Sequence, residues 1–367
     1  MGSRNGSPVA AGPAEIFTDL RAEADRIREL LAREVPESDV EPPPEEAPAA
    51  HVARHAEEER ARVLAAGARG LEKLAEGRDD EIGDDESFGL EAIVLLTGRP
   101  AILVQAGDFA PQEGEWAVLD GHREAIRESI ARVGRVDVSG HLSLDWVGTG
   151  FLVGADVVMT NRHVAVEFAR GDGTGWTFRP GLGAALDMAR EFGQLPGAGG
   201  LTYAVTEVVG VHDEVDMALL RVAPAPGGQP LPTPLAVAAD APADLPGRQV
   251  YVVGHPAWDG RRNEPESMRR IFMDVYNVKR LQPGAANQLL PTGDRPGAAG
   301  QGGRGGNVMT HDCSTLGGNS GSPVFDLADH RVLGLHFGGR YGFGNYAVPL
   351  WTMPDDPLVG RADLNFV

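Results

Sequence analysis

From Gly134 onward the chain is a series of short apolar segments, separated by turns that are rich in glycine and proline. The 367 residues include 49 glycines and 27 prolines, which favour turns and interrupt helices. The segments with the length and composition of strands are 135–138, 146–153, 156–160, 202–211, 217–222, 249–254, 271–279, 324–326, 332–337 and 345–349. Many short strands of this kind predict a mainly β fold with a pair of barrels.

The N-terminal quarter has a helical pattern instead. Apolar residues recur at spacings of three and four over 14–34, and a second such stretch covers 52–76. Between them, 40–50 is acidic and rich in proline, which is typical of a linker. We therefore expect residues 1–89 to form a helical, acidic extension.

Residues 90–133 are expected to connect this extension to the β domain and to pack on it. Apolar runs at 92–96 and 101–105 predict two strands, and the pattern over 116–133 predicts a helix. The β domain then covers 134–367.

The acidic charge balance limits the partners of this chain. The formal net charge is −20, and more than half of it lies in the first 90 residues, which disfavours nucleic acid and anionic membranes as partners. No apolar run is long enough to span a membrane, and the N-terminus lacks the apolar core of a secretory signal. Cys313 is the single cysteine and cannot form an intrachain disulfide, so we expect a reducing, cytoplasmic location.

Three segments carry residue types that together can perform nucleophilic catalysis. His163 follows two predicted strands that are joined by a tight turn, and Asp216 stands at the head of an apolar strand. Ser320 lies in Gly-Gly-Asn-Ser-Gly-Ser-Pro, a loop whose glycines can adopt conformations that other residues avoid. Each feature alone is common, because a histidine after a strand or an aspartate before one usually has a structural role.

The order histidine, aspartate, serine, together with these local motifs, resembles the trypsin/chymotrypsin superfamily over about residues 134–355. Within it, the chain is most similar to the glutamyl endopeptidases and to bacterial trypsin-like peptidase domains. The resemblance implies a chymotrypsin-like double six-stranded β-barrel and a serine endopeptidase that acts on protein or peptide substrates without a cofactor. Residues 134–367 are then the trypsin-like serine protease domain.

The resemblance also assigns roles to individual residues. Ser320 would attack the peptide carbonyl, and His163 would take its proton as general base. Asp216 would orient the imidazole; Asp213 is a competitor that we place second, because the apolar strand directly follows Asp216. The backbone N–H groups of Gly318 and Ser320 would form the oxyanion hole.

Residues near the nucleophile indicate the preferred side chain before the cleaved bond, P1. Trypsin-type enzymes carry an acidic residue six positions before the nucleophile, where this chain has Ser314, so a basic P1 residue is not favoured. Thr315, with His336 in Gly-Leu-His-Phe-Gly-Gly, resembles the glutamyl endopeptidases, in which this pair would bind a P1 carboxylate. Viral chymotrypsin-like proteases use the same pair for P1 glutamine, since a neutral imidazole can donate to either group. We expect glutamate first and glutamine second.

Several neighbouring residues are not expected to take part in catalysis. His311 and Asp312 are interpreted as loop residues, and Cys313 as a small buried residue. Ser322 precedes Pro323 and does not fit the position of the family's nucleophile. No cluster of His, Cys or Asp has metal-ligand spacing, so no metal is expected.

The N-terminal extension leads to two further hypotheses. Its helices, within 14–76, suit the binding of a protein partner or a regulator. They could also serve as an element that keeps the active site latent. In secreted glutamyl endopeptidases a free N-terminus completes the pocket, whereas here a long segment precedes the barrel. The alternative function is a catalytically latent protease-fold module that binds peptides without cutting them.

Overall fold

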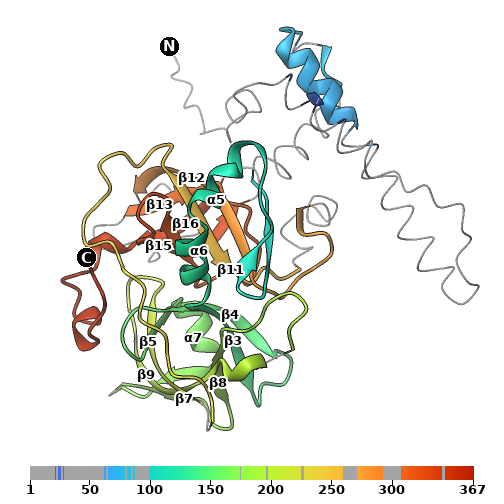
Figure 1. The fold of residues 1–367 in the computed structure, drawn as a ribbon. Coiled ribbons are helices and arrows are strands. Elements are labelled where there is room, and N and C mark those ends of the chain that lie inside the picture. Colours follow the sequence, from blue (N-terminus) through green and yellow to red (C-terminus); the bar gives the residue numbers. More distant parts are fainter. Residues whose placement is uncertain are drawn as a thin grey trace, which may run out of the picture. The chain divides into compact units, whose positions relative to one another are not determined.

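The computed structural model of the protein describes residues 99–173, 175–195, 197–224, 227–258, 271–291, 307–340 and 344–367, together with short stretches between residues 21 and 86 (Figure 1). The chain divides into two compact units. The first is Met1–Pro100 with Pro265–Asp274, and the second is Ala101–Glu264 with Val275–Val367. All the strands that the structure describes belong to the second unit.

In the first unit, both predicted helices are helical where they are described. The helical residues are 21, 24, 25 and 28 in the first predicted helix, and 62 and 65–75 in the second. An ion pair between Arg28 and Glu72 joins the two. The predicted linker at 40–50 and the predicted strand at 92–96 lie outside the described residues.

The first barrel is closed by six antiparallel strands in the order β10-β5-β4-β3-β8-β9. They are β3 (Val133–Ser139), β4 (Trp146–Leu152), β5 (Val157–Thr160), β8 (Gly183–Asp187), β9 (Thr202–Val211) and β10 (Ala218–Pro224). Its core is apolar and includes Leu152, Phe168 and Tyr203. Helix α7 (Arg162–Phe168) follows β5, and a small sheet of β6 (Ala169–Gly171) and β7 (Trp176–Phe178) comes next.

The second barrel has the strand order β11-β14-β15-β16-β13-β12 and is closed by pairing between β11 and β12. Its strands are β11 (Gln249–Gly254), β12 (Arg280–Pro291), β13 (Asn307–His311), β14 (Pro323–Asp326), β15 (Val332–Arg340) and β16 (Gly344–Pro349). The double six-stranded barrel that the resemblance implies is therefore confirmed.

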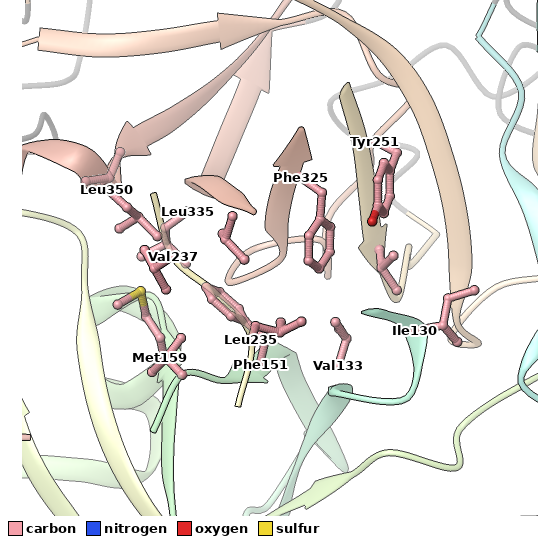
Figure 2. Close-up of a cluster of buried hydrophobic side chains, with 14 of the residues drawn as sticks. Ile130, Val133, Phe151, Met159, Leu235, Val237, Tyr251, Phe325, Leu335 and Leu350 are labelled. Carbon is pink, nitrogen blue, oxygen red and sulfur yellow. The ribbon is translucent and has the colours of Figure 1, made fainter. Parts of the chain in front are cut away.

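A shared apolar core joins the two barrels (Figure 2). Phe151 and Met159 enter it from the first barrel, and Tyr251 and Phe325 enter it from the second. The rings of Tyr251 and Phe325 stack with centroids 4.7 Å apart. Burial of side chains of this size is the main stabilising term at such a junction. This core therefore fixes the position of one barrel relative to the other, and with it the geometry of any site between them.

Residues 101–133, part of the predicted connecting segment 90–133, contribute apolar side chains to this core. Strand β1 (Ile102–Gln105) pairs with β12 and with β2 (Asp108–Phe109). The segment then forms η3 (Gly114–Ala117), α5 (Val118–Gly121) and α6 (Arg123–Ile130), and the side chains of Trp116 and Ile126 are buried. The single helix predicted over 116–133 is wrong, because the backbone at His122 is not helical and β3 begins at Val133. In the described part of the chain, no helix is long and apolar enough to cross a membrane.

The strand predicted over 271–279 is also wrong. Residues 271 and 272 are helical, and Met273, Asp274 and Asn277 have positive φ. Left-handed conformations of this kind cannot continue an extended strand. The pattern also missed β8, β12 and β13, whose sequences are rich in small and polar residues rather than in β-branched ones.

Lys279 is a fully buried lysine just before β12. Its Nζ donates to the carbonyl oxygens of Ile130 (3.1 Å) and Met188 (2.5 Å) and lies 3.6 Å from Oε1 of Glu191. The amine therefore ties the end of α6 and the segment after β8 to the start of the second barrel. Burial lowers the pKa of Lys279 to about 8.

Replacing Lys279 by methionine is expected to lower the free energy of unfolding by about 3 kcal/mol at pH 7, because two carbonyls and Glu191 lose their donor. The folded pKa of about 8 lies below the ordinary 10.5. Between these values the unfolded chain binds more protons, so the contribution of Lys279 to stability rises with pH. Urea titrations should show that the gap in free energy of unfolding between wild type and Lys279→Met widens from pH 8 to pH 10. A constant or narrowing gap would contradict this assignment.

Candidate active site

His163 lies in the first turn of α7, immediately after β5. Its Nδ1 is 2.7 Å from Oδ2 of Asp216, and its backbone N–H donates to Oδ1 of the same carboxylate at 3.0 Å. Asn161 donates through its side-chain amide to the backbone carbonyl of Asp216 at 2.9 Å. These three bonds fix the imidazole relative to the carboxylate. The histidine side chain is 44% exposed, whereas that of Asp216 is only 1% exposed.

Asp216, and not Asp213, is the carboxylate beside His163. Asp213 is exposed, and its backbone carbonyl accepts from Arg162. The turn before β10 places Asp216 inward: the N–H of Met217 bonds to Val215 at 2.8 Å. The sequence favoured Asp216 over Asp213 because an apolar strand follows Asp216 directly. The structure places Asp216, and not Asp213, beside His163.

Ser320 lies in the turn that precedes β14. Its backbone carbonyl accepts from the N–H of Thr149 at 2.8 Å, which fastens the loop to β4. A Cβ placed on Gly148 would meet the Ser320 carbonyl at 2.9 Å and the side chain of Val164 at 2.7 Å. Val164 directly follows His163, so the serine loop and the histidine turn both lie against β4, at the seam between the barrels.

The backbone N–H groups of Gly318 and Ser320 have no acceptor among the described residues. Gly318 has φ 86°, which lets the chain turn at this point. The N–H groups of Gly318 and Ser320 donate to no other residue that the structure describes, whereas those of Asn319 and Gly321 bond to Leu316 and His336. Gly318 and Ser320 are the pair that sequence reasoning assigned to the oxyanion hole, and both N–H groups are uncommitted among the described residues.

Gly321 is the position in this loop where a side chain should do most damage. It has φ 88°, and a Cβ there would meet the carbonyl oxygen of Thr149 and the hydroxyl of Thr160. Gly321→Ala is expected to cost about 2 kcal/mol of stability and to lower kcat/KM by more than about 100-fold, because the loop must move. Gly121→Ala is the matched control, since nothing lies within 4 Å of its Cβ position. Thermal midpoints and kcat/KM of both variants check this. If Gly321→Ala were as active as Gly121→Ala, the prediction would be contradicted.

Of the residues expected at the P1 pocket, His336 lies on β15 and Thr315 bonds to β16. His336 lies beside the serine loop: its backbone N–H donates to the carbonyl of Ser322, and its carbonyl accepts from the N–H of Gly321, both at 2.9 Å. Thr315 donates through its hydroxyl to Oδ1 of Asn345 at 2.7 Å. Asn345 in turn donates through Nδ2 to the backbone carbonyl of Cys313 at 2.6 Å. Sequence reasoning missed Asn345, because only the pairing of β16 with its neighbours brings it to Thr315.

His311 was interpreted as a loop residue, and this is wrong: it ends β13 and pairs with Asn345. Its Nε2 is 3.1 Å from Nδ1 of His336, and both side chains are buried. Burial lowers the pKa of His336 well below 6.5, and it lowers the pKa of His311 to about 4. The two imidazoles are therefore a neutral, hydrogen-bonded pair at pH 7.

Cys313 and Ser322 lie in the same region and were not expected to take part in catalysis. Cys313 is buried, as expected. Ser322 is fully buried, and its Oγ has no hydrogen-bond partner among the described residues. The described part of the chain contains no group of three or more His, Cys, Asp or Glu side chains that could hold a metal ion.

Comparison with known proteins gives the class. Residues 148–335 match the trypsin-like peptidase domain family. A Lysobacter enzymogenes protein named "Probable serine protease" is 30% identical over 316 residues, which covers 79% of each chain. The chain therefore belongs to the trypsin-like peptidase family and is a serine endopeptidase.

Other relatives are more distant. A glutamyl endopeptidase of Staphylococcus epidermidis is 25% identical over 52% of this chain and 54% of its own. A glutamyl endopeptidase of Staphylococcus aureus is 26% identical over 53% of this chain and 47% of its own. This chain thus spans about half the length of those relatives. The active-form crystal structure of the Rv3671c protease from M. tuberculosis has a TM-score of 0.43 at 20% identity, covering 72% of this chain and 91% of that chain.

Proposed function

We propose that this endopeptidase works by a triad of Ser320, His163 and Asp216, through an acyl-enzyme on Ser320. The observation that carries the proposal is the doubly hydrogen-bonded pair of His163 and buried Asp216, held at the same strand as the loop of Ser320. A buried carboxylate that bonds Nδ1 keeps Nε2 unprotonated, and an unprotonated Nε2 can accept a proton from a serine.

The first half of the reaction forms the acyl-enzyme. Oγ of Ser320 attacks the carbonyl carbon of the peptide bond while its proton passes to Nε2 of His163. The carbonyl oxygen becomes an oxyanion, which the N–H groups of Gly318 and Ser320 stabilise; each such donor contributes about 3 kcal/mol. His163 then gives the proton to the leaving amine as the carbon–nitrogen bond breaks. Asp216 stabilises the imidazolium in between.

The second half reverses these roles. A water molecule gives a proton to His163 and attacks the acyl carbon, and the bond to Ser320 breaks as its Oγ takes that proton back. The carboxylic acid product leaves. The protons thus pass only among the water, His163, Ser320 and the substrate.

The proposed P1 side chain is glutamate or glutamine. Thr315 and His336 support this, because Thr315 lies five residues before Ser320 and the backbone of His336 bonds to Gly321 and Ser322 in the serine loop. The Staphylococcus relatives are named glutamyl endopeptidases, which points in the same direction over half the chain.

A peptide library digested by the purified chain tests the proposal, with Ser320→Ala as control. We expect cleavage after residues with a carboxylate or amide side chain, and none by the variant. Cleavage after Lys or Arg would refute the P1 assignment, and cleavage by Ser320→Ala would refute the nucleophile. If the intact chain binds peptides without turnover, the latent-module alternative holds instead.

Regulation through residues 14–76 stays a prediction. Turnover by the full chain is to be compared with turnover by a chain that starts near Leu90. Faster turnover by the shorter chain is expected if the N-terminal helices keep the site latent, and equal rates would remove this idea.

A further inference from the structure

The ring of His212, the residue that follows β9, closes the turn that leads to Asp216. Its Nδ1 accepts from the backbone N–H groups of Glu214 at 3.0 Å and Val215 at 2.9 Å. An imidazole nitrogen that accepts carries no hydrogen, so the hydrogen of the neutral ring is on Nε2. The turn therefore needs one tautomer of His212.

The other nitrogen of this ring bonds to a residue near the C-terminus. Nε2 of His212 lies 3.0 Å from Oδ2 of Asp356, and the two side chains are 12% and 3% exposed. Oδ1 of Asp356 accepts from the N–H groups of Leu358 at 2.8 Å and Val359 at 3.4 Å. Burial raises the pKa of Asp356, but the hydrogen bonds from His212 and these N–H groups outweigh burial and hold the pKa below its usual value. Asp356 is thus a carboxylate at pH 7 and accepts the hydrogen of Nε2.

The segment that carries Asp356 is fastened to the first barrel. Leu358 belongs to the shared apolar core, and a Cβ placed on Gly210 of β9 would meet its side chain. Further along, the backbone N–H of Asn365 donates to the carbonyl of Val153 at 2.9 Å. Close packing of this kind leaves Asp356 little freedom, so its carboxylate is a fixed anchor for the ring of His212.

The start of α7 and the residue before it hold the two ends of the turn 212–216. Arg162 donates through Nη1 to the backbone carbonyl of His212 at 3.2 Å. Asn161 donates to the backbone carbonyl of Asp216 at 2.9 Å. The middle of the turn is bonded to the ring of His212, so the ring sets the path by which the chain reaches Asp216.

We propose that His212 is a positioning residue: its ring, anchored by Asp356, holds the turn that places Asp216 against His163. This inference rests on the proposed triad. His212 and Asp356 act through Asp216 and not on the substrate. A displacement of about 1 Å at a reacting group can cost about 100-fold in rate, so even a small shift of this turn should be visible in kcat.

Two substitutions at His212 separate positioning of the turn from attachment of the C-terminal segment. In His212→Asn, the side-chain oxygen stands where Nδ1 stood and can accept from the turn, but the side chain is too short to reach Asp356. His212→Gln is the reverse: its amide can donate to Asp356 as Nε2 does, and no acceptor is left at the position of Nδ1.

Kinetics of the full chain on the peptide that the wild type cuts fastest tests the inference. We expect His212→Gln to lower kcat by at least about tenfold with KM within about threefold, because Asp216 moves and the substrate contacts do not. His212→Asn should restore kcat to more than about a third of the wild-type value, although its thermal midpoint falls. A His212→Gln variant with wild-type kcat, or one that does not fold, overturns the inference. A folded His212→Asn no faster than His212→Gln also overturns it.

The proton between Nδ1 of His163 and Asp216 gives a second measurement. A charge-assisted hydrogen bond of 2.7 Å between an imidazole and a carboxylate places this proton far downfield in an NMR spectrum. The resonance should shift or broaden in His212→Gln and return in His212→Asn. A lowered kcat with an unchanged resonance would show that the loss does not come from Asp216, which contradicts the inference.

Asp356→Asn tests the anchor. The N–H of Leu358 keeps the amide oxygen, so the new NH₂ group faces the Nε2 hydrogen of His212. We expect kcat to fall about fivefold or more, with little further loss when this change is added to His212→Gln, whose amide can turn to accept from it. Asp355→Asn, at an exposed neighbour, is the control and should keep kcat within about twofold. Losses that multiply in the double variant would show that Asp356 does not act through His212.

Failure of this inference and failure of the triad proposal give different results. If the wild type cuts no peptide and a fluorophosphonate leaves Ser320 unmodified, the triad proposal fails and the role of His212 fails with it. If the wild type is labelled on Ser320 and cuts peptides, but His212→Gln turns over equally fast, only the role of His212 fails.

Discussion

Replacing Ser320 by alanine is expected to lower kcat/KM by about 10⁵- to 10⁶-fold, which is the scale of loss when a catalytic serine is removed. The fold should not change. The Ser320 hydroxyl makes no hydrogen bond to any residue that the structure describes, so its loss should alter the free energy of unfolding by less than about 0.5 kcal/mol. Kinetics on the best peptide, together with a urea titration, separates lost chemistry from lost structure.

Ser322→Ala is the matched control for this prediction. Ser322 lies two residues away, and its buried Oγ has no partner among the described residues, so its removal should be close to neutral. We expect activity within about tenfold of wild type, because Ser322 has no role in transition-state stabilisation. If instead Ser322→Ala were inactive and Ser320→Ala active, the nucleophile would be misassigned.

Asp216→Asn should lower kcat by about 10⁴-fold, and the structure gives the reason. Oδ1 of Asp216 accepts from the backbone N–H of His163, and Oδ2 faces Nδ1. In the variant, the backbone N–H keeps the amide oxygen, so the new NH₂ group points at Nδ1. The imidazole must then accept there, and its hydrogen moves to Nε2. A protonated Nε2 cannot take the proton of Ser320.

Asp213→Asn is the control, because Asp213 is exposed and its backbone carbonyl, not its carboxylate, contacts Arg162. We expect its kcat to stay within about twofold of wild type, as for most surface substitutions. Thermal midpoints show whether Asp216→Asn remains folded. A folded Asp216→Asn with wild-type kcat would exclude Asp216 as the residue that sets the tautomer.

The residues of the proposed triad stand out in the sequence because each depends on local chain geometry. His163 opens a helix after a buried strand, Asp216 heads an apolar strand, and Ser320 sits among glycines of which Gly321 has positive φ. A local motif encodes such features directly, and their order along the chain then indicated the family. The strands that carry them were found for the same reason, since apolar runs between turns mark them clearly.

Other features depend on contacts between distant segments. His311 reaches His336, and Asn345 reaches Thr315, only through the register of β13, β15 and β16, which the sequence pattern does not specify. Lys279 is similar: lysines are mostly exposed, and nothing local predicts that three groups from other segments surround its amine. Strand β8 was missed because its small residues have weak strand preference on their own.

The site of fluorophosphonate labelling tests the central claim most directly. The full chain would be incubated with the reagent, digested and mapped by mass spectrometry, with a denatured sample beside it. We expect one adduct, on Ser320, in the folded chain and none after denaturation, because the serine reacts only when His163 and Asp216 are in place. An adduct on a different serine, or none on folded chain that cleaves peptides, would contradict the assignment.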